Sequence, residues 1–282
     1  MIKNIARSIF GGLTEPYLDY FSSLKSTLKK SGMKTRLHDY VCIIIFISFI
    51  SFIASIIIGA VIITLTVSGP SYAYTLAIIV SFLVSGFVFF LGYYYPSLQA
   101  KDIQSKIDRS LPFSIFYMTT SASSGVNPLE IFRLLSIRGG KVGDEATKVY
   151  TNVKTLGMSL TSAVQKAAAS TPSPTFADLL WGMSSVLTTG GDLENYLKEK
   201  TKSAMAQYVR TLNDYAKQIS LYTEIYITLV IVGTLFFIIL IAIIAPLAGL
   251  SILFLQAFLA FVFIPLLSLG FIVVLRSISP LE

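Results

Sequence analysis

Two long stretches of this chain contain no charged side chain, and they constrain its fold more than any other feature. No Asp, Glu, Lys or Arg occurs from Val41 to Ala100 or from Ile225 to Leu275. A helix crosses the roughly 30 Å of bilayer hydrocarbon in about 20 residues, so each stretch is long enough for two crossings. Only 13% of the 282 residues are charged, about half the share that is usual in soluble domains. We therefore expect an integral membrane protein.

Residues that break helices fall near the middle of each charge-free stretch. Residues 68–71 (Ser-Gly-Pro-Ser) divide the first stretch, and residues 245–249, which include Pro246, divide the second. Each half is still long enough to span a membrane, and the backbone must stay hydrogen-bonded inside it. The sequence therefore predicts two helical hairpins, with four transmembrane helices near residues 41–67, 73–95, 222–245 and 250–275.

The distribution of basic residues predicts how these hairpins are oriented. Residues 1–40 hold seven Lys and Arg, residues 96–221 hold fourteen, and Arg276 follows the last span, whereas the two turns hold none. Loops rich in Lys and Arg stay on the cytoplasmic side of the cell membrane. We therefore expect a multi-pass protein with both termini in the cytoplasm. Its expected parts are an N-terminal segment (1–40), a hairpin (41–95), a cytoplasmic domain (96–221), a second hairpin (222–275) and a tail (276–282).

The large loop, residues 96–221, contains residues typical of helix starts and helix ends along its length. Pro112 can open a helix that Gly125 closes, and Asn127-Pro128 can cap and begin the next one. Similar Gly, Ser and Pro signals recur as far as residue 192, and no alternating strand-like run competes with them. The expected fold class is thus an all-α integral membrane protein whose two hairpins flank a cytoplasmic bundle of about six helices.

A long helix is expected to follow this bundle. Gly190-Gly191-Asp192 reads as the end of one helix and the N-cap of the next, and no proline follows until Pro246. A continuous helix over that distance would be roughly 80 Å long. Residues 189–192 (Thr-Gly-Gly-Asp) also resemble the Gly-x-Gly-Asp motif of intramembrane aspartyl proteases. Here the first glycine is missing, the site lies outside the apolar spans and no span holds a second Asp.

The residue inventory excludes most enzyme chemistry. The chain has one cysteine (Cys42) and one histidine (His38), too few for a disulfide, a zinc site or a Ser-His-Asp triad. Residues 139–142 lack the leading glycine and the hydroxyl residue of a phosphate-binding loop. No aromatic-basic cluster indicates nucleic-acid binding. We expect no catalytic residue, no cofactor and no metal.

Glu224 is the one acidic residue close to the hydrocarbon, at the expected cytoplasmic edge of the third span. Three interpretations remain open. The carboxylate can anchor the span at the interface, where Lys217, Arg109 or Lys106 could pair with it. It can contact a partner, or it can couple an ion, as intramembrane carboxylates often do.

An ordered series of motifs runs through the loop. It starts with residues 106–112 (Lys-Ile-Asp-Arg-Ser-Leu-Pro), continues through 123–128 and 171–173, and ends with 190–193 and 224–226. Together these motifs resemble the type II secretion F domain family of platform proteins. The resemblance is nearest to archaeal archaellum and type IV pilus platform proteins and their tight-adherence relatives. The positions that match the family's motifs are Arg109, Leu111, Pro112, Gly125, Pro128, Gly157, Thr171, Pro172, Ser173, Gly190, Gly191, Asp192 and Glu224.

The resemblance implies a non-enzymatic platform at the base of a filament or secretion machine. Its implied partners are a hexameric secretion ATPase, pilin- or archaellin-like subunits and membrane lipid. Larger family members often carry two copies of the domain, so a second copy of this chain or a paralogue is implied as well. The residues leave one alternative open, a small membrane transporter or the membrane subunit of one. Such a protein should carry polar groups at mid-membrane, which these spans largely lack.

Overall fold

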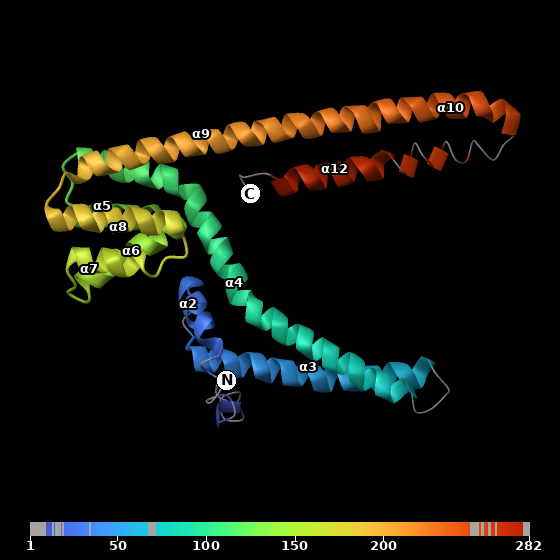
Figure 1. The fold of residues 1–282 in the computed structure, drawn as a ribbon, viewed down its shortest axis with the longest axis horizontal. Helices are drawn as coiled ribbons and strands as arrows, with labels where there is room; N and C mark the ends of the chain where they lie inside the picture. Colours follow the sequence, from blue (N-terminus) through green and yellow to red (C-terminus); the bar gives the residue numbers. More distant parts are fainter. Residues whose placement is uncertain are drawn as a thin grey trace. The chain divides into compact units, whose positions relative to one another are not determined.

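Every element in the computed structural model is helical (Figure 1). The structure describes residues 10–12, 14, 18, 20–33, 35–66, 72–248, 254, 257–258, 261–262 and 264–278. The chain divides into two compact units, Met1–Lys198 and Glu199–Glu282. The expected turn at 68–71 and most of residues 249–263 lie outside the described residues. Within the described part of the chain, the prediction of an all-α fold is confirmed.

In the first unit the short helix α2 (Ser22–Lys30) packs on α3 (Leu37–Thr66) and α4 (Tyr72–Ser123). Leu24 and Leu28 of α2 are buried against Val41. Tyr93 of α4 is one of the partly buried side chains around them. The lysines of α2 stay exposed, so α2 is an amphipathic helix with its apolar stripe turned to the hairpin.

Helices α3 and α4 lie side by side over most of α3 (Figure 1). The hydroxyl of Tyr40 donates to the carbonyl of Gly92 at 2.9 Å. A Cβ on Gly92 would lie 3.0 Å from Cγ2 of Ile44, so glycine lets the helices approach closely. Ser48 and Ser85 hydrogen-bond across the pair, with Oγ atoms 2.9 Å apart. Small and polar residues thus hold the first hairpin together where apolar side chains gain little from leaving lipid.

Helix α4 runs through two prolines, Pro96 and Pro112. The expectation that Pro112 opens a helix is therefore wrong. A proline inside a helix leaves the carbonyl four residues earlier without its N–H partner, and at Pro112 this is the carbonyl of Asp108. The helix persists because Ile107 and Ile115, on either side of the proline, are buried. Tertiary packing thus outweighs one lost backbone bond.

The end of α4 packs with four further helices into a bundle. These are α5 (Pro128–Arg138), α6 (Gly140–Lys154), α7 (Leu160–Ala168) and α8 (Pro174–Thr189). Consecutive helices run in opposite directions (Figure 1). Their largest fully buried side chains are Phe132, Phe176, Ile107, Met118, Ile131, Leu135, Leu180 and Met183.

Three helices of the bundle begin at a side chain that caps them. The side-chain oxygens of Asn127, Ser159 and Ser173 accept backbone N–H groups at 3.0, 3.2 and 3.0 Å. Pro128 and Pro174 follow two of these caps at the first helical position. The helix start predicted at Asn127-Pro128 is confirmed, and Ser159 and Ser173 belong to the Ser and Pro signals noted further along the loop. Short sequence motifs reveal such caps because a cap is a local interaction.

A helical run of three elements follows the bundle. Helix α9 (Leu193–Tyr226) leads into a π-helix, η2 (Ile227–Val232), and then into α10 (Gly233–Ala248). Pro246 lies inside the last turn of α10. The expected long helix is present, with a stretch of wider turns that its sequence did not indicate. In the second unit α12 (Ile264–Ile278) lies beside this run, and Tyr226 hydrogen-bonds Ser268 at 3.1 Å.

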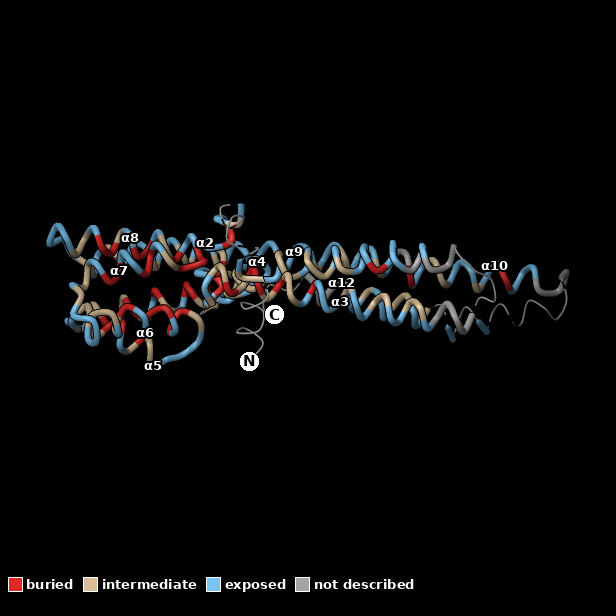
Figure 2. Tube along the Cα trace, turned by 90° about the horizontal axis from the view of Figure 1, so that it is seen from below, coloured by how far each residue is buried: buried red, intermediate tan, exposed pale blue. Residues whose placement is uncertain are grey.

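Three of the described helices are long and apolar enough to cross a membrane. They are Leu37–Val61, Ile78–Ser123 and Leu193–Ile244. Large apolar side chains on them are exposed, such as Phe82 (73%) and Phe236 (62%), and exposed residues line these helices in Figure 2. Apolar exposure on this scale suits lipid rather than water, so the chain is a membrane protein. Within the expected fourth span the structure describes a shorter apolar helix, Ile264–Val273, and a fourth crossing stays a prediction.

Candidate functional site

The motif residues of the loop gather at two opposite ends of the bundle (Figure 1). At the first, which we call the α7–α8 end, the turn between α7 and α8 meets α4. This end holds Arg109, Leu111, Pro112, Thr171, Pro172 and Ser173. At the second, which we call the α8–α9 end, lie the turns that follow α4, α6 and α8. It holds Gly125, Pro128, Gly157, Gly190, Gly191 and Asp192.

Ser173 joins the two parts of the α7–α8 end. Its hydroxyl donates to Oδ1 of Asp108 on α4 and accepts the backbone N–H of Phe176 at 3.0 Å. One side chain therefore caps α8 and fastens it to a helix 65 residues away in sequence. Ser173 is fully buried, and Thr171 is 4% exposed. A hydrogen bond to a carboxylate is stronger than one between neutral groups, so this turn is held firmly in place.

The α4 residues at this end divide into buried and exposed ones. Leu111 and Pro112 are buried, whereas Arg109 is exposed. Arg133 on α5 serves as a comparison, because it is an arginine with an acidic partner. It donates to Glu130 at 2.9 Å, and this hydrogen bond raises the pKa of Arg133 above its ordinary value. Arg109 forms no such ion pair with any acidic side chain among the residues that the structure describes. Arg109 is thus the motif residue at this end that a partner could reach.

At the α8–α9 end the motif residues shape turns. Gly190 ends α8 with a φ of +69°, a backbone conformation that favours glycine. The N–H of Gly191 donates to the carbonyl of Val186 at 3.0 Å. Oδ1 of Asp192 accepts the N–H of Asn195 at 3.0 Å. The interpretation of this motif as a helix stop followed by an N-cap is confirmed.

Two contacts fix the first turn of α9 on the bundle. The hydroxyl of Ser123 at the end of α4 donates to Glu194 at 2.8 Å. The hydroxyl of Tyr196 donates to the carbonyl of Leu179 at 3.0 Å, with the ring lying over Gly182. A Cβ at Gly182 would lie 2.0 Å from the Tyr196 oxygen, so only glycine leaves room for this ring.

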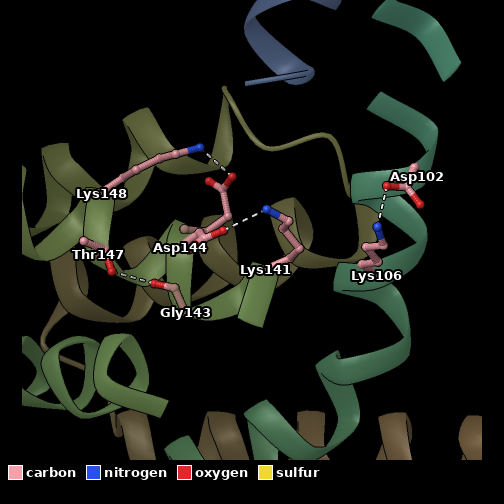
Figure 3. Close-up of polar contacts among 8 residues, drawn as sticks. Asp102, Lys106, Lys141, Gly143, Asp144, Thr147 and Lys148 are labelled. Atoms are coloured by element: carbon pink, nitrogen blue, oxygen red, sulfur yellow. Dashed lines mark hydrogen bonds and ion pairs between the residues drawn. The ribbon is translucent and has the colours of Figure 1, made fainter. Parts of the chain in front are cut away.

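Pairs of lysines and carboxylates line α6 and the facing part of α4 (Figure 3). Their Nζ–oxygen distances are 2.6 Å for Lys106–Asp102, 3.0 Å for Lys141–Asp144 and 2.6 Å for Lys148–Glu145. Exposed pairs of this kind contribute little to stability. Glu145 is different because its side chain is 4% exposed. Its second oxygen, Oε2, has no hydrogen-bond partner among the described residues, so Lys148 is the group that compensates this buried charge.

Glu224 lies in the second unit, one residue before the second charge-free stretch. It is exposed and borders a hollow of about 380 Å³ with side chains of the same helical run, from Ile219 to Thr228. Among the described residues it forms no ion pair, with Lys217 or with any other cation. The π-helix η2 begins three residues later. Interfacial anchoring, partner contact and ion coupling all stay predictions for this residue.

The sole histidine and the sole cysteine of the chain lie one turn apart on α3. Nε2 of His38 and Sγ of Cys42 are 4.0 Å apart, and the hydroxyl of Thr14 lies 3.4 and 3.3 Å from them. In the described ranges, no three His, Cys, Asp or Glu side chains come together as a metal site requires. This cluster ties the described part of the N-terminal segment to α3.

Three residues that support the bundle were not among the site residues predicted from the sequence. Asp108 binds Ser173, and Glu145 is the buried acid of α6. A Cβ on Gly143 would lie 3.1 Å from the carbonyl oxygen of Leu135, so this glycine permits close packing of α5 on α6. A signal existed for Glu145, because it falls three residues after Val142 and four before Val149, both buried, on one helical face.

Known proteins provide matches to much of the chain. Residues 115–241, from α4 to α10, match the model of the type II secretion system protein F family. The chain is 27% identical over 204 residues, or 71% of its length, to Flagella accessory protein J of Methanocaldococcus jannaschii. It is 23% identical over 143 residues, or 50% of its length, to an uncharacterized protein of the same organism. No solved structure matches the chain.

The helical bundle and the apolar helices define an all-helical membrane protein, part of which matches the type II secretion F domain. Residues 115–241 are similar to the type II secretion system protein F family, and Flagella accessory protein J is among the relatives. The resemblance noted from the sequence is thereby confirmed. The aligned region spans 34% of Flagella accessory protein J and 24% of the uncharacterized relative, so both are far longer than the part they share with this chain.

Proposed function

We propose that this chain is a non-enzymatic platform of an archaellum, type IV pilus-like or type II secretion machine. It couples a cytoplasmic secretion ATPase to the insertion of pilin- or archaellin-like subunits into a filament. The observation that carries this proposal is the F-domain match at residues 115–241, which includes both the bundle and an apolar helix. The similarity to Flagella accessory protein J favours the archaellum branch of the family.

In the proposed topology the N-terminal segment, the bundle and the C-terminal tail lie in the cytoplasm. The support is the distribution of Lys and Arg, with seven in residues 1–40, fourteen in 96–221 and none in the two turns. Four crossings bring both termini to the same side. The bundle then faces the compartment where an ATPase finds its nucleotide.

The coupling element in this proposal is the helical run Leu193–Ile244. Its first part carries charged residues as far as Glu224, and its second part is free of charge. A continuous hydrogen-bonded helix resists axial compression, so a displacement imposed on the charged part is passed to the part within lipid. Pilin-like helices already in the membrane would join the platform through close packing rather than hydrophobic burial.

The proposed contact for the ATPase includes Arg109 at the α7–α8 end, which is exposed and forms no ion pair with any described residue. The test is a pull-down of candidate secretion ATPases with the full chain in a neutral detergent. Arg109→Ala should weaken capture about tenfold or more, since a close charge pair at an interface is worth about 1.5 kcal/mol or more. Lys154→Ala is the matched control, because Lys154 is also exposed but ends α6 at the opposite end of the bundle.

Deletion in cells separates this function from transport. The platform proposal predicts that surface filaments disappear and that uptake of solutes is unchanged. Normal filaments together with loss of uptake of one solute would contradict it.

We also propose that a second copy of this chain or a paralogue supplies another F domain. Crosslinking in membranes should then trap a dimer or a mixed pair.

A further inference from the structure

A basic groove lies in the first unit, between α2, α6 and α7. It is a hollow of about 380 Å³ into which three helices each contribute a lysine, Lys29 from α2, Lys148 from α6 and Lys166 from α7. Thr151 and Asn152 of α6 also line it. We call this hollow the α2–α6–α7 groove. None of the motif residues at the two ends of the bundle lines it.

The charge in the groove is only partly compensated. Lys148 pairs with Glu145 at 2.6 Å. Lys166 has a neutral neighbour, Oδ1 of Asn152 at 3.4 Å, and within the described residues neither Lys166 nor Lys29 has a carboxylate within ion-pair distance. The groove therefore presents two ammonium groups that no described carboxylate neutralises, together with hydroxyl and amide donors. A group with several anionic oxygens fits such a set of donors.

The position of α2 relates this groove to the membrane. Leu24 and Leu28 pack on Val41, the first residue of the charge-free stretch, and close to Tyr93 on the second helix of the hairpin. α2 therefore lies at the level where α3 and α4 leave the apolar region. Because α3 and α4 form a hairpin, their outer ends emerge on one side of the membrane whatever its orientation. The groove is then on the headgroup side of that boundary.

We propose that the α2–α6–α7 groove binds the phosphate of an anionic lipid headgroup and thereby holds the bundle against the membrane surface. Basic pockets next to membrane helices recognise phosphate headgroups in this way, and juxtamembrane lysines are attracted to anionic leaflets. The proposal does not depend on the platform function. An acidic protein segment is the competing occupant, and the lipid is favoured because α2 sits on the membrane-facing hairpin.

The test uses the full chain in neutral detergent micelles and follows its thermal unfolding midpoint as lipid is added. The probes are phosphatidylglycerol, zwitterionic phosphatidylcholine and free glycerol 3-phosphate. The variant is Lys29→Gln with Lys166→Gln, and Lys148 is kept because it compensates Glu145. The matched control is Lys154→Gln with Lys198→Gln, which removes the same charge from exposed positions outside the groove.

Phosphatidylglycerol should raise the midpoint of the wild type and of the control, and phosphatidylcholine should not. In the groove variant the apparent affinity for phosphatidylglycerol should fall about tenfold or more, with an unchanged midpoint in the absence of lipid. An equal response of the groove variant and the control would overturn the site. An equal shift from glycerol 3-phosphate would overturn the lipid as ligand, as would capture of an acidic protein that needs the two lysines while lipid has no effect. If the double variant does not fold, Lys29→Gln alone replaces it in the same titration.

Discussion

The bundle and the apolar helices differ in where they place their large apolar side chains. In the bundle, side chains such as Phe132 and Phe176 are fully buried, and polar caps close the helices. Along the apolar helices, side chains of the same kind are exposed, with Phe82 at 73% and Phe236 at 62%. The bundle must bury its apolar surface because water surrounds it, whereas lipid accepts that surface on the helices. Identical substitutions should therefore have very different effects in the two regions.

The largest contrast is expected for phenylalanine. Phe132→Ala should destabilise the bundle by about 3–5 kcal/mol, because a fully buried ring leaves a cavity. Phe236→Ala, at an exposed position of α10, should cost far less. Thermal or denaturant unfolding of both variants in detergent measures the difference. Equal losses would mean that α10 packs as tightly as the bundle does.

The next contrast is between two glycines inside helices. Gly182→Ala should destabilise by about 1–3 kcal/mol, because the new Cβ would lie 2.0 Å from the Tyr196 hydroxyl oxygen and displace its hydrogen bond to Leu179. Gly233→Ala meets nothing within 4 Å and should be neutral or stabilising, since alanine favours helix. Unfolding midpoints of the two variants give the comparison. A harmless Gly182→Ala would show that the Tyr196 ring does not lie where the structure places it.

A smaller effect is expected at the buried cap of α8. Ser173→Ala removes the hydroxyl that caps α8 by accepting the N–H of Phe176, and it also leaves Asp108 without that hydrogen-bond partner. The free energy of unfolding should therefore fall by about 2 kcal/mol. The double variant Ser173→Ala, Asp108→Ala should lose less than the sum of the two single changes, because the two groups interact. Strict additivity in chemical denaturation would argue against their hydrogen bond.

The smallest effect is expected at the exposed cap of α9. Asp192→Ala should cost about 1 kcal/mol, since water can replace part of what the carboxylate does for the N–H of Asn195. Asp192→Asn is the control and should retain most of the stability. If Asp192→Ala abolishes filament assembly with an unchanged melting profile, the residue has a role beyond capping.

Local interactions were the part of the fold that could be predicted from the sequence. Asn127, Ser159, Ser173 and Asp192 cap helices as their neighbours indicated, because a cap needs only three or four consecutive residues. The prediction that Pro112 opens a helix was wrong, because a proline is tolerated inside a helix when the packing on either side outweighs the lost hydrogen bond.

Contacts between distant segments were the part that could not be predicted. The hydrogen bond of Ser173 to Asp108 joins residues 65 positions apart, and the basic groove combines lysines from three helices. Neither contact can be recognised from the spacing of residues within one segment of the sequence. The same holds for the division of the motif residues between the two ends of the bundle, which follows from the antiparallel order of the helices (Figure 1).

The central claim is that the bundle lies in the cytoplasm while the apolar helices cross the membrane. Cysteine accessibility tests it most directly, because Cys42 is the only native cysteine and it is buried. A Cys42→Ser background with Ser185→Cys places one thiol on the exposed face of α8. A membrane-impermeant maleimide should label this thiol in inverted vesicles and in lysed cells but leave it unlabelled in intact cells. Labelling in intact cells would place the bundle outside, where no cytoplasmic ATPase could reach it.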